Sequence, residues 1–290
     1  MEKRTEKDSL GAVEVPRDAY YGASTQRAVE NFPVSGLQLP AVFLKKLALI
    51  KQLAARVNRD LGLLDESTAG AIDAACQEII NGKLADQFPV DVFQTGSGTS
   101  TNMNMNEVIA SRSNEMLTGK KGGRRPVHPN DHVNLGQSSN DVIPTVLNVC
   151  AALTVRDRLV PALEQLEIAL REKTRAFADI GKIGRTHLQD AVPITLGNEF
   201  EGYTCQVQKS VARATHITHE LAELPLGGTA VGNGLNTHPE FAQKVIAELV
   251  AQTGFPFQEA RSHFEAQGLS LIHISEPTRL DARSRMPSSD

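Results

Sequence analysis

Residues 193–225 read PITLGNEFEGYTCQVQKSVARATHITHELAELP, and this stretch decides the fold class. Apolar side chains recur in it at steps of three and four, the spacing of one face of an α-helix. They are Leu196, Phe200, Tyr203, Val207, Val211, Ala214, Ile217, Leu221 and Leu224. At about 1.5 Å per residue, such a helix is a rod of roughly 45 Å. One small domain cannot cover a rod of that length, so the stretch predicts a helical bundle, either within a monomer or shared with partner subunits.

The same periodicity predicts five shorter helices upstream. They run from Pro40 to Gly62, from Asp65 to Asn81, from about Asn102 to Gly119, from Pro144 to about Arg158, and from Pro161 to Phe177. Gly11–Pro16 is interpreted as a short edge strand or an extended arm. The chain is therefore predicted to be mainly α, with a mostly helical domain over 1–137 and part of a long central helical bundle over 138–268.

Composition narrows the class of protein. The chain has 290 residues, a formal net charge of −4 and 40% hydrophobic residues, which is ordinary for a soluble globular protein. Weak acidity argues against nucleic-acid or membrane partners, and no apolar run approaches the ~20 residues of a membrane span. Cys76, Cys150 and Cys205 are far apart and odd in number. They predict small core residues in a reducing cytoplasm, without a disulfide framework or a CxxC metal site.

Four polar clusters precede predicted helices and are candidate ligand-binding segments. They are TGSGTSTN (95–102), HPNDH (128–132), QSSND (137–141) and GRTHLQD (184–190). A helix N-terminus offers unpaired N–H donors and about half a positive charge, and Ser, Thr and Asn add further donors. Several such ends meeting at one point would bind a small anion with two or more carboxylates. Each cluster alone could equally be an N-cap, and the Ser138–Asn140 segment taken alone favours a cap.

Two histidines stand out from their neighbours. His187 is flanked by Thr186 and Gln189, which makes it a candidate site residue. His128 lies within a polar cluster that either binds an anion or forms a turn.

Taken together, the motifs resemble the fumarase/aspartase superfamily, and most closely the class II fumarases. The resemblance runs in order from about residue 8 to residue 267. It is carried by GAVEVP (11–16), YYGASTQR (20–27), GSGTSTNMN (96–104), HPNDHVN (128–134), QSSND (137–141), GRTHLQDA (184–191) and LGGTAVG (226–232).

The resemblance implies a lyase that hydrates fumarate to L-malate reversibly, as in the tricarboxylic acid cycle. It implies that His187 is catalytic and that six residues contact the C4 dicarboxylate, namely Ser97, Thr99, Ser138, Ser139, Asn140 and Thr186. It also implies an accessory dicarboxylate site at Arg125, His128, Asn130 and Asp131. Family members are homotetramers with a shared bundle and use no metal or cofactor. Two alternatives stay open: an aspartase-type ammonia-lyase, and a non-catalytic structural protein such as the lens crystallins of this superfamily.

One departure from the family concerns the C-terminal part of the sequence. The family's signature loop, GSSxMPxKxNP, supplies a serine that resembles the catalytic base, and it does not occur here. Residues 269–290 read LSLIHISEPTRLDARSRMPSSD and are interpreted as a non-native tail, with a disordered terminus as the alternative. The sequence therefore predicts an N-terminal portion of a fumarase with little or no turnover.

Overall fold

The computed structural model describes residues 2–8 and 10–268. The predicted tail, 269–290, lies outside the described residues. The chain divides into two compact units: unit 1 comprises Met1–Cys150 and Glu223–Asp290, and unit 2 comprises Ala151–Ala222. The predicted domain boundary after residue 137 stays a prediction.

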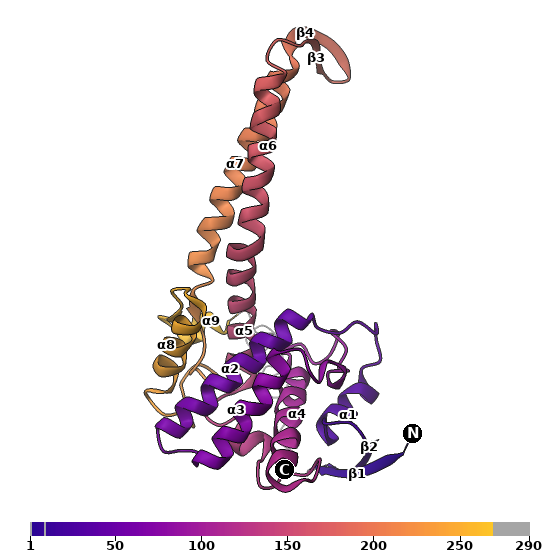
Figure 1. Cartoon of the computed structure of the whole chain (residues 1–290), viewed down its shortest axis with the longest axis vertical. Helices are drawn as coiled ribbons and strands as arrows, with labels where there is room; N and C mark the ends of the chain where they lie inside the picture. Colours follow the sequence, from indigo (N-terminus) through magenta and orange to yellow (C-terminus); the bar gives the residue numbers. More distant parts are fainter. Residues whose placement is uncertain (1, 9, 269–290) are drawn as a thin grey trace, which may run out of the picture. The chain divides into compact units, whose positions relative to one another are not determined.

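Unit 1 is a helical domain (Figure 1). Its helices are α1 (Ala23–Asn31), α2 (Ala41–Asp60), α3 (Glu66–Ile80), α4 (Thr99–Thr118), most of α5 (Ser139–Thr154), α8 (Phe241–Thr253) and α9 (His263–Ala266), with short helical turns at Ala85–Gln87 and Pro129–Val133. α2 packs against α3 and α8, and α3 packs against α4. Fully buried aliphatic side chains such as Leu47, Ile72 and Met105 form the core between them. Removing this apolar surface from water is the main stabilising contribution.

The predicted helix ends in unit 1 are confirmed by local signals. Asp65 caps α3, because its side chain accepts a hydrogen bond from Thr68 N at 2.9 Å. Gly62 and Gly119 follow α2 and α4 in the left-handed conformation that favours glycine. One predicted start is wrong: α5 begins at Ser139, so Pro144 lies inside the helix rather than in its first turn.

The described part of unit 1 also contains two small sheets. β1 (Lys3–Asp8) pairs antiparallel with β2 (Gly11–Pro16), which confirms the predicted edge strand. The charged sequence of β1, KRTEKD, carried no apolar signal, so its pairing was not predicted. Arg27 of α1 contacts Asp8 at 2.9 Å and ties the hairpin to the helices. β5 (Glu223–Leu224) pairs in parallel with β6 (Gln258–Glu259).

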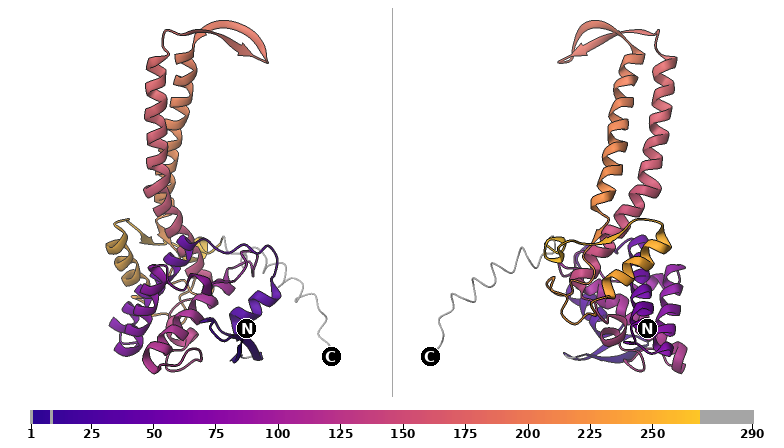
Figure 2. Two further views of the ribbon diagram at one scale, coloured as in Figure 1. Left: turned by 45° about the vertical axis from the view of Figure 1, so that its right-hand side comes forward. Right: turned by 90° about the vertical axis from the view of Figure 1, so that its left-hand side faces the viewer.

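Unit 2 contains the stretch that decides the fold class. α6 (Val160–Ala176) and α7 (Leu196–Glu220) lie side by side, and the hairpin of β3 (Gly181–Thr186) and β4 (Gln189–Thr195) joins them (Figures 1 and 2). A short π-helix, Val155–Leu159, precedes α6. The predicted long helix is confirmed, but it ends at Glu220, before the predicted Pro225. Among the described helices, none is both long and apolar enough to cross a membrane.

Two expectations about unit 2 are wrong. The cluster 184–190 was expected just before a helix, but it forms the strand ends and the turn of the β3–β4 hairpin. The alternating β-branched residues Ile183, Val192 and Ile194 are the overlooked strand signal. Cys205 was expected in a core, yet it is exposed on α7; Cys76 is buried and Cys150 is half-buried.

Candidate functional site

The start of α5 carries three of the predicted substrate-contacting residues. Ser138 caps the helix, because its Oγ accepts a hydrogen bond from Asn140 N at 3.3 Å. The Ser138 N–H donates to Asp141 Oδ1 at 2.9 Å. The capping role expected from the sequence is therefore present, and the helix N-terminus still presents the hydroxyl of Ser139 and the amide of Asn140.

Asp141 is fully buried and joins the start of α5 to the glycine-rich loop after β5. Its Oδ2 accepts hydrogen bonds from Gly227 N at 3.2 Å and from Thr229 N at 2.8 Å. Burial raises the pKa of Asp141 to about 6, although the backbone N–H groups that it binds act in the opposite direction. Asn140 adds a second link, since its Nδ2 donates to Ala230 O at 2.8 Å. The loop is thus held against α5 by side chains of α5 itself.

A hollow of about 570 Å³ opens between these segments. It is lined by residues 130–131, 134–138, 229–231, 233 and 235–236. The structure therefore brings the predicted contact residue Ser138 to the same hollow as Asn130 and Asp131. A volume of this size accommodates a small organic ligand.

The start of α4 packs directly on α5. Gly98 caps α4 with φ 71°, and a Cβ at this position would lie 3.0 Å from Ile143 Cγ2. Only glycine allows both the left-handed conformation and this close approach. Ser97 Oγ and Thr99 Oγ1, on either side of Gly98, lie 2.8 Å apart. The hydroxyls of Ser97 and Thr99 are thus carried by a helix start that touches α5.

A buried polar chain lies beneath these helix starts. Lys51 of α2 donates from Nζ to Asn134 Oδ1 at 2.7 Å. Asn102 of α4 donates from Nδ2 to the same Oδ1 at 3.2 Å and to Ser139 Oγ at 2.9 Å. Lys51 is 0% exposed and Asn102 is 1% exposed. Burial lowers the pKa of Lys51 to about 7, and the carboxylate of Asp141 opposes that shift.

Sequence reasoning missed Lys51, Asn102 and Asn134 as site residues. Lys51 lies one helical turn after Leu47, on the buried face of α2. A lysine in an apolar stripe needs a buried partner, and that was an available signal. Asn102 and Asn134 occurred in quoted motifs, but their inward orientation was not visible in the sequence.

The predicted accessory cluster surrounds a second hollow of about 550 Å³, lined by Arg124, Arg125, Pro126, His128, Asp131 and His132. His128 Nδ1 accepts hydrogen bonds from the backbone N–H groups of Asn130 at 3.3 Å and Asp131 at 3.1 Å. A nitrogen that accepts these bonds carries no proton, so the ring is neutral and holds its proton on Nε2. Burial of the ring lowers the pKa of His128, which also favours the neutral form. The carboxylate of Asp131, with Oδ2 3.2 Å from Nδ1, opposes this shift in pKa because it favours the protonated ring.

Thr186 and His187 belong to unit 2, whereas the other predicted contact residues belong to unit 1. Both are exposed on the β3–β4 hairpin. His187 and Leu188 form the turn with φ values of 48° and 63°, and the guanidinium of Arg185 donates to Leu188 O at 2.8 Å. Positive φ at non-glycine residues costs energy and is often found at functional sites.

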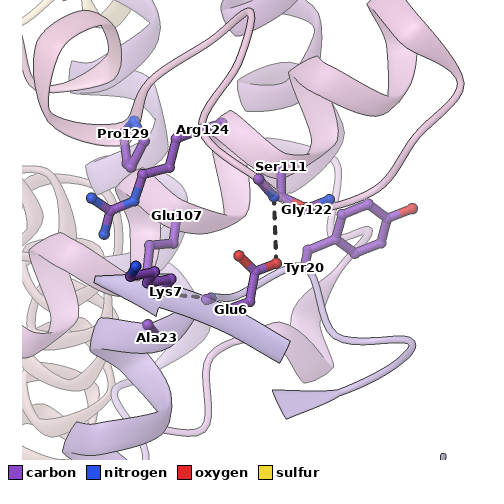
Figure 3. Close-up of a pocket in the computed structure, with 12 residues that line it drawn as sticks. Glu6, Lys7, Tyr20, Ala23, Glu107, Ser111, Gly122, Arg124 and Pro129 are labelled. Carbon is purple, nitrogen blue, oxygen red and sulfur yellow. Dashed lines mark hydrogen bonds between the residues drawn. The ribbon is translucent and has the colours of Figure 1, made fainter. Parts of the chain in front are cut away.

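A much smaller cavity, of about 20 Å³, lies beside β1 and α4 and is lined in part by Glu6, Lys7, Glu107 and Arg124 (Figure 3). Its size suits about one water molecule. Glu107 caps α1 here, accepting hydrogen bonds from Gly22 N and Ser24 N at 2.9 Å. None of the predicted substrate-contacting residues lines this cavity. In the described part of the chain, no group of three or more His, Cys, Asp or Glu side chains is arranged to hold a metal ion.

Comparisons with known proteins show the family to which the chain belongs. Residues 11–269 match the sequence profile of a family described as "Lyase". The chain is 55% identical over 272 residues to a fumarate hydratase class II from Nitrosomonas europaea, and 56% identical over 264 residues to one from Halobacterium salinarum. These matches cover 93% and 91% of this chain but 59% and 56% of the relatives. The chain thus spans under three-fifths of the length of these relatives.

Solved structures give the same result for the fold. A class II fumarase from Schistosoma mansoni superposes with a TM-score of 0.87 at 37% identity, covering 99% of this chain and 66% of that chain. A fumarate lyase/delta crystallin from Brucella melitensis gives a TM-score of 0.87 at 41% identity, with the same coverage. The expected superfamily fold is therefore confirmed.

Proposed function

The chain belongs to this lyase family, and from that premise we propose that its protein is a class II fumarate hydratase, which interconverts fumarate and L-malate. The structural observation that supports the proposal is the contact between two helix starts rich in hydroxyl donors. Gly98 and Ile143 hold the start of α4 against α5, so that Ser97 and Thr99 are near the segment that carries Ser139. Such donors suit the carboxylates of a small dianion.

The chemistry explains why hydrogen-bond donors suit this reaction. Dehydration of malate removes a weakly acidic proton from the carbon beside one carboxylate, and hydroxide leaves from the neighbouring carbon. Negative charge develops on the carboxylate oxygens, and preorganised N–H and O–H donors stabilise it. We assign this binding role to Ser97, Thr99, Ser138, Ser139, Asn140 and Thr186. We assign to His187 the handling of a water that assists the departure of hydroxide.

The second hollow is proposed as an accessory dicarboxylate site. Arg125 supplies a positive charge at its rim, and neutral His128 has an N–H on Nε2 to donate. Asn130 adds an amide, and Asp131 fixes the turn through its backbone N–H to His128. Asp131 lines both hollows, which supports an accessory site beside the larger one.

A homotetramer and a cytoplasmic location are further parts of the proposal. The α6–α7 pair leaves large apolar side chains exposed, among them Leu166, Ile168, Tyr203 and Ile217. Packing against other copies would remove them from water. The three cysteines are free, as suits a reducing compartment. Light scattering combined with size-exclusion chromatography tests the tetramer; a monodisperse monomer would contradict it.

The activity is tested on the product of the complete open reading frame that encodes this sequence, because the chain spans only part of its relatives. We expect fumarate to be converted to L-malate without added ammonia, and Ser139→Ala to weaken substrate binding. Consumption of fumarate only with ammonia would instead indicate an aspartase. Dicarboxylate binding without any turnover would indicate a non-catalytic member of the superfamily.

A further inference from the structure

We propose that Asn102 is a positioning residue that turns the Ser139 hydroxyl into an obligate hydrogen-bond donor towards the bound carboxylate, and that Lys51 and Asn134 fix Asn102 in the orientation this requires. The inference rests on the proposed function, since it concerns how that site recognises its dianion. It assigns a role to three residues outside the substrate-contacting set, of which Lys51 and Asn102 are buried and Asn134 lines the hollow.

The first step concerns groups whose hydrogen-bonding role is fixed. Asn134 Nδ2 donates to the carbonyl oxygen of Gln137 at 3.1 Å, and a carbonyl can only accept. Lys51 Nζ lies 2.7 Å from Asn134 Oδ1, and the amine has N–H groups to donate in either protonation state. The two partners together determine which atom of the Asn134 amide is oxygen. Asn134 therefore presents an acceptor, and only an acceptor, to its remaining neighbour.

That neighbour is Asn102. The Asn102 amide nitrogen lies 3.2 Å from Asn134 Oδ1, so a flipped amide would bring two oxygens together without a proton between them. The Nδ2 group of Asn102 must therefore face Asn134 Oδ1, and the same nitrogen lies 2.9 Å from Ser139 Oγ. Because Asn102 is 1% exposed, water cannot take over either bond. Asn102 donates to Ser139.

The consequence falls on the Ser139 hydroxyl. Its oxygen accepts from Asn102, so its proton must point elsewhere. Within residues 2–8 and 10–268, no protein acceptor takes that proton. Ser139 is half-buried at the N-terminus of α5, where the helix dipole favours an anion. A free O–H at this position suits a carboxylate oxygen and disfavours a ligand that offers only donors.

A double-mutant cycle tests the inference on the product of the complete open reading frame. The variants are Ser139→Ala, Asn102→Leu and the double variant, and the readouts are the dissociation constant for L-malate together with KM and kcat. A lost hydrogen bond to a charged group predicts about 10- to 100-fold weaker binding for Ser139→Ala. We expect about 5- to 10-fold for Asn102→Leu, and a double variant within about twofold of Ser139→Ala, because Asn102 acts through Ser139.

Asn104→Leu is the matched control. Asn104 is also a buried asparagine of α4, at 1% exposed, but its Nδ2 donates to Gln87 O at 3.0 Å rather than to a site residue. We expect it to lower the melting temperature much as Asn102→Leu does, with malate binding unchanged. Asn102→Ser removes the amide without adding an apolar group and replaces Asn102→Leu if that variant does not fold. Lys51→Met should weaken malate binding severalfold and show no further loss when combined with Asn102→Leu.

The outcomes separate the two proposals. If Ser139→Ala weakens binding but the losses in the double variant add, the positioning role of Asn102 is wrong and the proposed function stands. If the unsubstituted protein binds no dicarboxylate, or Ser139→Ala leaves binding unchanged, the proposed site itself fails and the inference falls with it.

Discussion

The starts of α4 and α5 differ from the β3–β4 hairpin in how their predicted site residues are held. In unit 1, Ser138 and Ser139 are fixed by buried partners, and Asp141, Asn102 and the side chains behind them have almost no contact with water. In unit 2, Thr186 and His187 lie exposed on a two-stranded turn. Substitutions behind the first region should therefore change stability and binding together, whereas substitutions in the second should change activity with little effect on stability.

The largest loss of unfolding free energy is expected for Asp141→Ala. The substitution leaves three backbone N–H groups, those of Ser138, Gly227 and Thr229, without their acceptor. Each unpaired buried donor costs about 1–3 kcal/mol, so we expect a loss of at least about 3 kcal/mol or failure to fold. Urea unfolding measures it. Asp190→Ala, at an exposed position of the hairpin, is the control and should stay within about 0.5 kcal/mol; equal losses would remove the distinction between the regions.

The next effect concerns glycine and has opposite signs in the two units. Gly98→Ala forces a positive φ on alanine and brings its Cβ to 3.0 Å from Ile143, so we expect a loss of about 1–3 kcal/mol. Gly202→Ala lies inside α7 with open space around its Cβ position, and there we expect a gain of about 0.5–1 kcal/mol. Thermal unfolding of both variants decides this. A neutral Gly98→Ala would mean that α4 does not need to approach α5 so closely.

The third effect on the unfolding free energy depends on pH. Burial lowers the pKa of Lys51 to about 7 in the folded protein, from an ordinary value of 10.5. Between these values the unfolded chain binds one proton more than the folded one, so the stability contributed by this group rises with pH and is lost as pH falls through about 7. Urea unfolding from pH 7 to pH 9 should show a rise of up to about 1.4 kcal/mol per pH unit, relative to Lys51→Met.

Lys182→Met is the matched control for that measurement. Lys182 forms a half-exposed ion pair with Glu199 at the foot of the hairpin. The unfolding free energy of the Lys182→Met variant should depend on pH as that of the unsubstituted protein does. Asp141 affects the unfolding free energy at lower pH and with the opposite sign. Because burial raises its pKa to about 6 in the folded protein, the stability that this group contributes is lost as pH rises through that value. If Lys51→Met and the unsubstituted protein show the same slope of unfolding free energy with pH, the pKa of Lys51 is not lowered in the folded protein.

How much of the fold and of the candidate site could be predicted from the sequence depends on how far apart in the chain the interacting residues lie. The helices with apolar stripes and caps were predicted because Asp65, Gly62 and Gly119 act within one turn of the chain. The β3–β4 hairpin was not predicted, because the polar residues at 184–190 obscured the short alternation of β-branched residues in its strands. The polar chain from Lys51 to Ser139 joins residues more than 80 positions apart. No signal in the neighbouring sequence predicts which of these polar side chains contact one another.

The last and smallest change in stability is expected at the hairpin turn. His187→Asn replaces an exposed residue at φ 48°, a conformation that asparagine adopts readily, so the unfolding free energy should change by less than about 0.5 kcal/mol. In the complete protein, fumarate hydration should still fall by about 10²- to 10⁴-fold, the usual contribution of one acid–base group. Dicarboxylate binding should change far less, because the donors of unit 1 are untouched. A variant that keeps its activity would remove His187 from the proposed mechanism and leave the two helix starts to account for the site.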